Sequence, residues 1–576
     1  MAASNKDINP LKRFIDLLRP EKDLIIIIYI YGIFAGLISL TLPLGIQAII
    51  NFIMGGDVST SWILLVILVI LGIIITGVLQ VKQLSITETL QQKIFTKASF
   101  EFAYRIPRFN LNQVKNTYLP ELINRFFDTV SVQKGLSKIL IDFSTGALQI
   151  IFGLILLSFY HPFFIIFSFL LVILIFLIIR LTGPKGLSTS LDESHYKYET
   201  AHWLEELARN VETFKMSEGS DLPLRNNDKN TENYLESRQS HFKVVVSQFS
   251  MMIAFKALVA AGLLLIGGIL VFQQQMNIGQ FVAAEIIIIL VINSVEKLIG
   301  TIETIYDVLT SVEKLGVVTD IPLEEYLSGN KKVDPDQGIS VRLKNLTLTD
   351  RDHTFLKNVS LNIDAGDKIC ISGPSNAGKT ILLQLISGWF SDYEGNVLIN
   401  DLPLNDINLT SLRKQIGDCM ATEGIFQGSI EENIQIGSPF SSFKEIQEAT
   451  EISGLSNYMD SNHIGYQKIL YPGDRTFPKR AKQQILWARG ILGNKKLILW
   501  EDTSGQLSHK EKLHFVNHLL NLDKHTTVII VSNDLSIVKR CNRAVGMENG
   551  EVLYDISADE AKENEWFRNN CLMRDA

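Results

Sequence analysis

The sequence is poor in cysteine and proline, and it carries no excess of positive charge. Only 4 of its 576 residues are cysteine and 15 are proline, and the formal net charge is -7 at pH 7. We expect no nucleic acid as a partner, because nucleic-acid-binding domains usually present a basic surface. The cysteines have no metal-ligand spacing, and they favour a thiol-bearing domain in a reducing cytosol. They are Cys370, Cys419, Cys541 and Cys571.

Charged residues are also scarce, at 20%, whereas hydrophobic residues make up 47%. The chain is too long for a single core, so we expect at least two domains, one of them in a membrane. The N-terminus lacks the pattern of a cleavable signal. The segment 24–56 is uncharged throughout, and it is longer than the ~7–15-residue apolar core of a signal peptide.

The first half of the chain contains six long apolar segments. A spanning helix needs ~20 mostly apolar residues, and each of these segments approaches or exceeds that length. The uncharged run 143–179 is interrupted by His161-Pro162, which predicts two spans joined by a tight turn, since the residue before a proline disfavours helix. The predicted spans are 24–50, 62–81, 139–160, 163–181, 244–272 and 278–295.

The distribution of Lys and Arg predicts the orientation of these spans. The connections 51–61, 161–162 and 273–277 contain no Lys or Arg, whereas the N-terminus and the other connections are basic. Basic loops lie on the cytoplasmic side. We therefore predict a multi-pass protein of the inner (plasma) membrane, in contact with membrane lipid, with both termini cytoplasmic.

Lys256 and Glu285 are exceptions to the apolar pattern within the predicted spans. Lys256 and Glu285 are functional candidates, because charges within a membrane are costly. Lys256 is also compatible with a place near the interface, where a long side chain reaches water. The Glu285 side chain either faces a central cavity or has a structural role only.

A phosphate-binding loop follows the membrane half. The buried-strand pattern 368–372 leads into G-x-x-x-x-G-K-T, and an apolar helix pattern begins at Ile381. Backbone N–H groups of such a loop approach phosphate oxygens, aided by the helix N-terminus. Lys379 is expected to reach the β- and γ-phosphates of ATP, and Thr380 to ligate Mg²⁺. The loop residues are Gly373, Pro374, Ser375, Asn376, Ala377, Gly378, Lys379 and Thr380.

Further segments resemble the ATPase domain of ABC transporters. They are LRKQIG at 412–417, GSIEENI at 428–434, QQILWAR at 483–489, TVIIVS at 527–532 and NG at 549–550. The long, polar, helix-prone stretches 82–138 and 182–243 resemble the exporter type of this family, whose helices continue into the cytosol. The hydropathy of the membrane half alone is also compatible with an unrelated protein that has six spans and cytoplasmic loops, because hydropathy gives the topology and not the fold.

The resemblance implies a fold and a domain order. The fold is an α-helical membrane domain with six transmembrane helices of the ABC exporter type, followed by an α/β P-loop ABC ATPase domain. We expect the membrane domain at 1–325, a linker at 326–338 and a degenerate nucleotide-binding domain at 339–576. The chain looks most similar to peptide and protein exporters of the haemolysin and bacteriocin secretion type.

The sequence departs from the family at several functional positions. Ala421 stands where a Gln contacts Mg²⁺ and the attacking water, and Asn533 stands where a His contacts the γ-phosphate. The family signature, which binds the γ-phosphate of the opposite subunit, reads Phe477-Pro-Lys-Arg-Ala481 here. These losses predict ATP binding with impaired hydrolysis.

The acidic strand that follows allows two alignments. Anchoring on Thr503-Ser504 places Trp500 at the Mg²⁺-binding Asp. Counting from Gln483 without gaps instead makes Glu501 the Mg²⁺ ligand and Asp502 the general base, and this alignment is preferred. Asp502 is one methylene shorter than the usual Glu, which makes it a weak base.

Sequence and resemblance together predict the ATP-binding subunit of an exporter, with ATP and Mg²⁺ as cofactors and weak or partner-dependent ATPase activity. We expect a homodimer, or a heterodimer with a second ABC half-transporter, and a periplasmic adaptor is compatible with the haemolysin-type resemblance. The alternative is a non-transporting ABC-like membrane protein that uses nucleotide binding for sensing or assembly. The sequence does not indicate the substrate.

Overall fold

The computed structural model describes residues 9–55, 60–114, 117–324, 329–350, 353–420, 424–474, 476–502 and 505–571. The chain divides into two compact units. The first consists of Met1–Pro107 and Asn116–Ile321, and the second of Arg108–Lys115 and Pro322–Ala576. No sequence pattern had indicated that Arg108–Lys115 groups with the second unit. The domain limits expected at 325 and 339 remain predictions.

Six helical segments of the first unit are long and apolar enough to cross a membrane, which confirms the six predicted spans. They extend far beyond the apolar segments. The longest single helix, α9 (Pro162–Arg209), has 48 residues, or ~72 Å, against ~30 Å for a hydrocarbon core. The segments are Pro10–Met54, Thr60–Arg108, Leu119–Ser158, Pro162–Arg209, Leu222–Phe272 and Ile278–Thr319.

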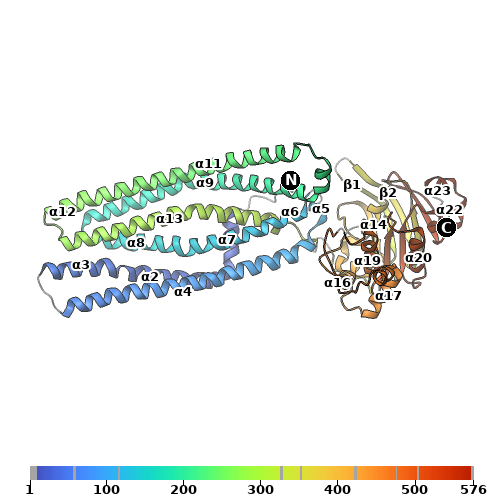
Figure 1. Cartoon of the computed structure of the whole chain (residues 1–576), viewed down its shortest axis with the longest axis horizontal. Helices are drawn as coiled ribbons and strands as arrows, with labels where there is room; N and C mark the ends of the chain where they lie inside the picture. The colour runs from blue at the N-terminus through green and yellow to red at the C-terminus, as the bar shows by residue number, and fades with distance from the viewer. Residues whose placement is uncertain are drawn as a thin grey trace. The chain divides into compact units, whose positions relative to one another are not determined.

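These segments are built from shorter elements where the helix changes (Figure 1). The first contains α1 (Pro10–Leu18), α2 (Lys22–Ser39) and α3 (Thr41–Met54), and the second contains α4 (Thr60–Arg105). The third contains α6 (Leu119–Ile123), α7 (Asp128–Ser137), the π-helical turn η4 (Lys138–Phe143) and α8 (Ser144–Ser158). The fifth contains α11 (Leu222–Gly262) and α12 (Gly268–Phe272), and the sixth is α13 (Ile278–Thr319).

The predicted turn at His161-Pro162 is present. Pro162 begins α9, and the Phe163 backbone N–H donates to His161 Nδ1 at 3.2 Å. A proline suits the first turn of a helix, because its missing N–H would have no partner there. Asn277 caps α13 through reciprocal hydrogen bonds with Gln280. Local sequence therefore fixes both helix starts.

Glycines allow α13 to pack closely against α7 and α8. A Cβ added to Gly135 would lie 2.1 Å from Val308 Cγ2, and one added to Gly146 would lie 3.2 Å from the Ser294 carbonyl oxygen. Close backbone approach of this kind stabilises helix pairs in membranes. The two contacts also fix an antiparallel alignment, with Gly135 level with Val308 and Gly146 level with Ser294.

The two charges expected within the spans have different surroundings. Lys256 on α11 forms an ion pair with Glu296 on α13 at 2.5 Å. The sequence had not indicated this partner. Glu285 is half-buried on α13, and its role remains a prediction.

The second unit contains two main sheets, as predicted for an α/β ATPase domain. One is six-stranded in the order β12-β11-β3-β10-β9-β6, and the other is four-stranded in the order β2-β1-β4-β5. In the larger sheet only β12 runs antiparallel to its neighbour. Its strands are β3 (Lys368–Ser372), β6 (Ile416–Cys419), β9 (Leu497–Glu501), β10 (Thr527–Val531), β11 (Arg543–Glu548) and β12 (Glu551–Ser557). The smaller sheet contains β1 (Val341–Asp350), β2 (His353–Ile363), β4 (Glu394–Ile399) and β5 (Leu402–Pro403).

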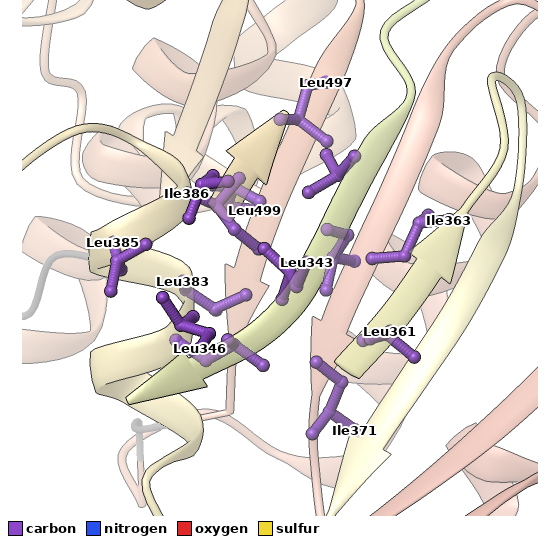
Figure 2. Close-up of a cluster of buried hydrophobic side chains, with 14 of the residues drawn as sticks. Leu343, Leu346, Leu361, Ile363, Ile371, Leu383, Leu385, Ile386, Leu497 and Leu499 are labelled. Carbon is purple, nitrogen blue, oxygen red and sulfur yellow. The ribbon is translucent and has the colours of Figure 1, made fainter. Parts of the chain in front are cut away.

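The helix α14 (Lys379–Ile386) packs into a core shared by both sheets. Figure 2 shows its side chains Leu383 and Ile386 in one cluster with Leu343 of β1 and Leu499 of β9. All of these residues are buried. Because α14 directly follows β3, this packing fixes the position of the loop between them.

The second unit contains further helices, several of which Figure 1 labels. They are α5 (Leu111–Val114), α15 (Leu409–Gln415), α16 (Ile430–Gln435), α17 (Phe443–Ser453), α18 (Leu455–Ser461), α19 (Lys479–Ile491), α20 (His509–Leu520), α21 (Leu535–Val538), α22 (Ala558–Glu563) and α23 (Glu565–Asn570). A two-stranded sheet joins β7 (Gly428–Ser429) to β8 (Ile469–Leu470). All four cysteines are buried and unpaired.

Candidate nucleotide-binding site

The glycine-rich loop lies between β3 and α14, where the sequence predicted it. All five residues of β3 are buried. Gly373 has φ 154° and Gly378 has φ 91°, values that side chains rarely adopt. A Cβ on Gly373 would also lie 2.0 Å from the Met547 carbonyl oxygen. Both glycines are therefore required by the backbone path, and the N–H groups at the start of α14 face the loop.

Lys379, the first residue of α14, bends back over the loop. Its Nζ donates hydrogen bonds of 2.7 Å to the carbonyl oxygens of Gly373 and Pro374. Burial lowers the pKa of Lys379, and the nearby Glu501 carboxylate partly offsets this effect. The ammonium group is thus held at the loop, where it can exchange these bonds for phosphate oxygens.

Thr380 and Glu501 are brought together at the end of β9. The Thr380 hydroxyl donates to Glu501 Oε1 at 2.5 Å. Burial raises the pKa of Glu501, while the bond from Thr380 and the charge of Lys379 lower it. A hydroxyl and a carboxylate are hard oxygen ligands of the kind that Mg²⁺ takes together with phosphate oxygens and water. These two residues therefore fit a magnesium ion held jointly with a nucleotide.

The neighbouring Trp500 points away from this position. It is fully buried, and its ring lies 5.8 Å from that of Trp487 on α19. The alignment that places Trp500 at the Mg²⁺-binding position would thus put a core side chain there. Thr503 and Ser504, on which that alignment was anchored, lie outside the described residues.

Asp502, the predicted weak base, is paired with a lysine that the sequence had not indicated. Lys512 Nζ lies 2.6 Å from Asp502 Oδ1, and the two side chains are only 5% and 16% exposed. The Ser532 hydroxyl donates to Asp502 Oδ2 at 3.3 Å. Both oxygens of Asp502 therefore have protein partners.

Asn533 is likewise engaged by the loop itself. Its Nδ2 donates to the Gly373 carbonyl oxygen at 2.8 Å, and its Oδ1 accepts from the Gly373 N–H at 3.0 Å. Both polar atoms of the amide thus bind one residue of the loop. Ala421, the third predicted catalytic position, lies outside the described residues.

The signature segment forms the start of α19. Phe477 is buried and packs edge-to-face on Tyr458, with ring centroids 5.5 Å apart. Pro478 is the N-cap residue, and no side chain caps the helix there. Arg480 forms a 2.5 Å ion pair with Glu511 on α20. The segment Phe477–Ala481 contains no hydroxyl side chain, so it does not offer the serine of the family.

The fold and this site define a membrane protein with a fused P-loop nucleotide-binding domain. Two family models match the chain. "ABC transporter transmembrane region" matches residues 25–295, and "ABC transporter" matches residues 356–504. Together they cover more than two thirds of the sequence. The chain belongs to the ABC transporter family, and it joins the transmembrane and ATP-binding regions of that family in one polypeptide.

Among curated proteins, the chain is similar to the leukotoxin translocation ATP-binding protein LktB of Pasteurella haemolytica-like sp. (strain 5943B). The two are 29% identical over 309 residues, which cover 53% of this chain and 42% of that protein. The alpha-hemolysin translocation ATP-binding protein HlyB of Escherichia coli O157:H7 is 28% identical over 291 residues, 50% of this chain and 41% of that protein. The match thus spans less than half the length of these relatives.

A solved structure shares the whole fold. It is that of a bacterial Atm1-family ABC exporter with ATP bound, with a TM-score of 0.80 and 16% sequence identity. The match covers 96% of this chain and 97% of that one. The ABC exporter fold predicted from the long helices is therefore confirmed.

Proposed function

We propose that the chain is the ATP-binding subunit of an exporter that binds MgATP but hydrolyses it poorly by itself. The observation that carries this proposal is the contrast within the site. Lys379, Thr380 and Glu501 form a phosphate and metal position, whereas Asp502 and Asn533 have their polar atoms bound by protein groups. A base that is held by Lys512 is a poor acceptor for the proton of the attacking water.

The groups of this chain divide the work as follows. The loop 373–380 binds the phosphates through its N–H groups, and Lys379 adds a charge-assisted donor. Thr380 and Glu501 hold the magnesium ion, which supplies charge neutralisation at the phosphates. The signature segment of a partner completes each site in the family, so the sequence Phe477–Ala481 weakens the opposite site of a homodimer. Hydrolysis at useful rates then requires a partner with complete motifs.

We further propose the setting and the cargo. The connections without Lys or Arg alternate with basic connections, and this pattern supports an inner-membrane protein with both termini cytoplasmic. The printed names of LktB and HlyB refer to translocation of a leukotoxin and of α-haemolysin, and they support a polypeptide as the cargo. A periplasmic adaptor as a partner is part of the proposal and follows from the resemblance to exporters of the haemolysin type. The partner half is a second copy or another ABC half-transporter.

The test of nucleotide binding without turnover uses the purified full chain in nanodiscs. We expect saturable MgATP binding by calorimetry together with phosphate release far below ~1 s⁻¹, the low end of ordinary enzyme rates. Asp502→Glu should not restore turnover, because Lys512, Asn533 and the signature segment remain. Turnover at or above ~1 s⁻¹ would contradict the proposal.

The orientation has its own test. A cysteine introduced at Gln274 should react with an impermeant thiol reagent from outside intact cells, whereas the buried native Cys370 should not. The reverse pattern would overturn the assignment of the cytoplasmic side.

The engagement of Asp502 and Asn533 also favours a second candidate, a membrane protein that uses bound nucleotide for sensing or assembly without transport. Reconstituted vesicles separate the two. Export requires cargo uptake into inside-out vesicles that depends on ATP and on an added partner half. Nucleotide-dependent conformational change without uptake would support the second candidate.

A further inference from the structure

A groove in the first unit is lined by lysine and hydroxyl side chains from three helices. It has a volume of about 350 Å³, near the lower end of the ~300–1,000 Å³ range of ligand pockets. The lining comes from α7 with the adjoining turn η4, from α9 and from α13 (Figure 1). It contains three lysines, Lys134, Lys138 and Lys197, against two carboxylates, Glu193 and Asp307. The lining therefore keeps an excess of positive charge.

Two of the lysines have no carboxylate partner among the described residues. Lys134 and Lys138 are exposed and stand one helical turn apart, so their side chains share one face. Lys138 also begins the π-helical turn η4, a distortion that is frequent at functional sites. Across the groove, Glu193 is already paired with Arg238 Nη1, at 3.1 and 3.2 Å from its two oxygens. The lysine pair is thus available to an anion.

The floor of the groove offers hydroxyl groups. Ser194 and Ser311 are 7% and 6% exposed, and within the described residues neither hydroxyl has a hydrogen-bond partner. Neighbouring Ser190 and Thr310 bond to each other at 2.9 Å. Ser194 and Ser311 therefore supply donors that only a ligand or water in the groove can satisfy.

The position of the groove argues against a lipid headgroup as its occupant. Gly146 is level with Ser294, at the end of the apolar part of α13. Lys138 directly precedes the predicted span 139–160, so it stands at the edge of the apolar region. On α9, Ser194 lies thirteen residues, or ~20 Å, beyond the last residue of the predicted span, Leu181. The groove thus extends from the edge of the apolar region into the polar part of the helices, where a water-soluble chain has access.

We propose that this groove binds carboxylate groups of an acidic peptide segment of the transported cargo. Lys134 and Lys138 pair with the carboxylates, and Ser194 and Ser311 donate hydrogen bonds from the floor. Asp307, an exposed carboxylate on α13, disfavours ligands with a dense negative charge such as a phosphate dianion. The proposal rests on the proposed exporter function, since it names the chemistry of the cargo.

The test uses the full chain in nanodiscs of phosphatidylcholine and a fluorescein-labelled hexaglutamate peptide, followed by fluorescence anisotropy. The double variant Lys134→Ser with Lys138→Ser should bind the peptide about tenfold or more weakly. The matched control is Lys215→Ser with Lys229→Ser, which removes the same charge from exposed lysines outside the groove. It should change the dissociation constant by less than about twofold.

A second variant tests the floor without changing charge. Ser194→Ala with Ser311→Ala should weaken peptide binding about threefold or more. Equal losses in the groove and control lysine pairs would show general attraction to charge, and they would overturn the proposal, as would no binding by the unmodified chain.

Nanodiscs that contain phosphatidylglycerol test whether an anionic lipid headgroup occupies the groove. If this lipid displaces the peptide from the unmodified chain but not from the double lysine variant, the groove is a headgroup site and the proposal is wrong. Binding of a fluorescent ATP analogue is measured on the same samples. Absence of peptide binding by the unmodified chain, with Lys379-dependent nucleotide binding intact, would overturn the groove proposal and leave the nucleotide site standing.

Discussion

Two halves of one nucleotide site differ in how their polar atoms are used. On the side of β3 and α14, Lys379 and Thr380 bond to the loop and to Glu501, contacts that phosphate and Mg²⁺ can replace. On the side of β10, Asp502 and Asn533 are bound by Lys512 and by Gly373. The first half is arranged to exchange partners, and the second is held by protein contacts. The proposed weakness of hydrolysis therefore rests on protein contacts of Asp502 and Asn533 as well as on replaced residues.

The largest expected effect is on stability, and it comes from the ion pair between Lys512 and Asp502. Lys512→Ala leaves Asp502 buried with its charge uncompensated, which should cost about 3–5 kcal/mol of unfolding free energy. We expect the Tm, followed by fluorescence of buried Trp487 and Trp500, to fall by ~10 °C. The matched control Lys512→Met with Asp502→Leu removes both charges and should cost much less. An equally unstable double variant would contradict the role of the pair.

Phosphate binding is tested most directly by a substitution of Lys379. Lys379→Ala should weaken ATP binding at least about tenfold, or ~1.4 kcal/mol, because a charge-assisted donor is lost. Asn533→Ala serves as the comparison and should leave ATP affinity within about threefold, since both polar atoms of the amide are already bonded to Gly373. Calorimetry measures both. Unchanged affinity in Lys379→Ala would remove the site assignment.

The proposed role of Thr380 and Glu501 as Mg²⁺ ligands is tested by comparing ATP binding with and without Mg²⁺. Thr380→Val keeps the shape of the side chain but removes the hydroxyl, so it should weaken binding of MgATP about threefold to tenfold. Binding of ATP in EDTA should stay the same as in the unmodified chain. Equal losses with and without Mg²⁺ would show that Thr380 does not act through the metal.

The smallest effect comes from the buried carboxylate of Glu501. Burial raises its pKa, so the folded state holds the proton more tightly than the unfolded state does. The ionised form therefore costs stability at neutral pH, and this cost disappears as the pH falls below the ordinary value of ~4.3. Without Mg²⁺, Glu501→Gln should raise the Tm by ~2 °C at pH 7 and by less near pH 4. A constant difference across this range would contradict the shift.

The sequence predicted the features that depend on local pattern. Six apolar segments, the turn at His161-Pro162 and the loop 373–380 were each readable from spacing alone, and the structure places them as expected. The part of α9 beyond the predicted span was indicated only by a polar, helix-prone composition, because hydropathy identifies only the apolar part of a helix. Fold class followed from these patterns together with the family resemblance.

Contacts between distant segments could not be predicted in the same way. The partners of Asp502 and Asn533 depend on how α20 and β10 pack beside β3, and nothing in the local sequence around Asp502 indicates Lys512. The ion pair between Lys256 and Glu296 joins two helices separated by a turn. The groove hydroxyls are ordinary helix residues in sequence, and only tertiary packing leaves Ser194 and Ser311 without a partner.

The continuity of α9 has a mechanical consequence. The helix has 48 residues, and the part from Pro184 to Arg209 is ~37 Å long, so a bend of roughly 5° at Pro184 moves its far end by ~3 Å. Pro184 is the one proline inside this helix, and it removes one backbone hydrogen bond from the rod. A bend in α9 is therefore expected at Pro184, close to the end of the predicted span at Leu181, and a small change there would be enlarged at Arg209.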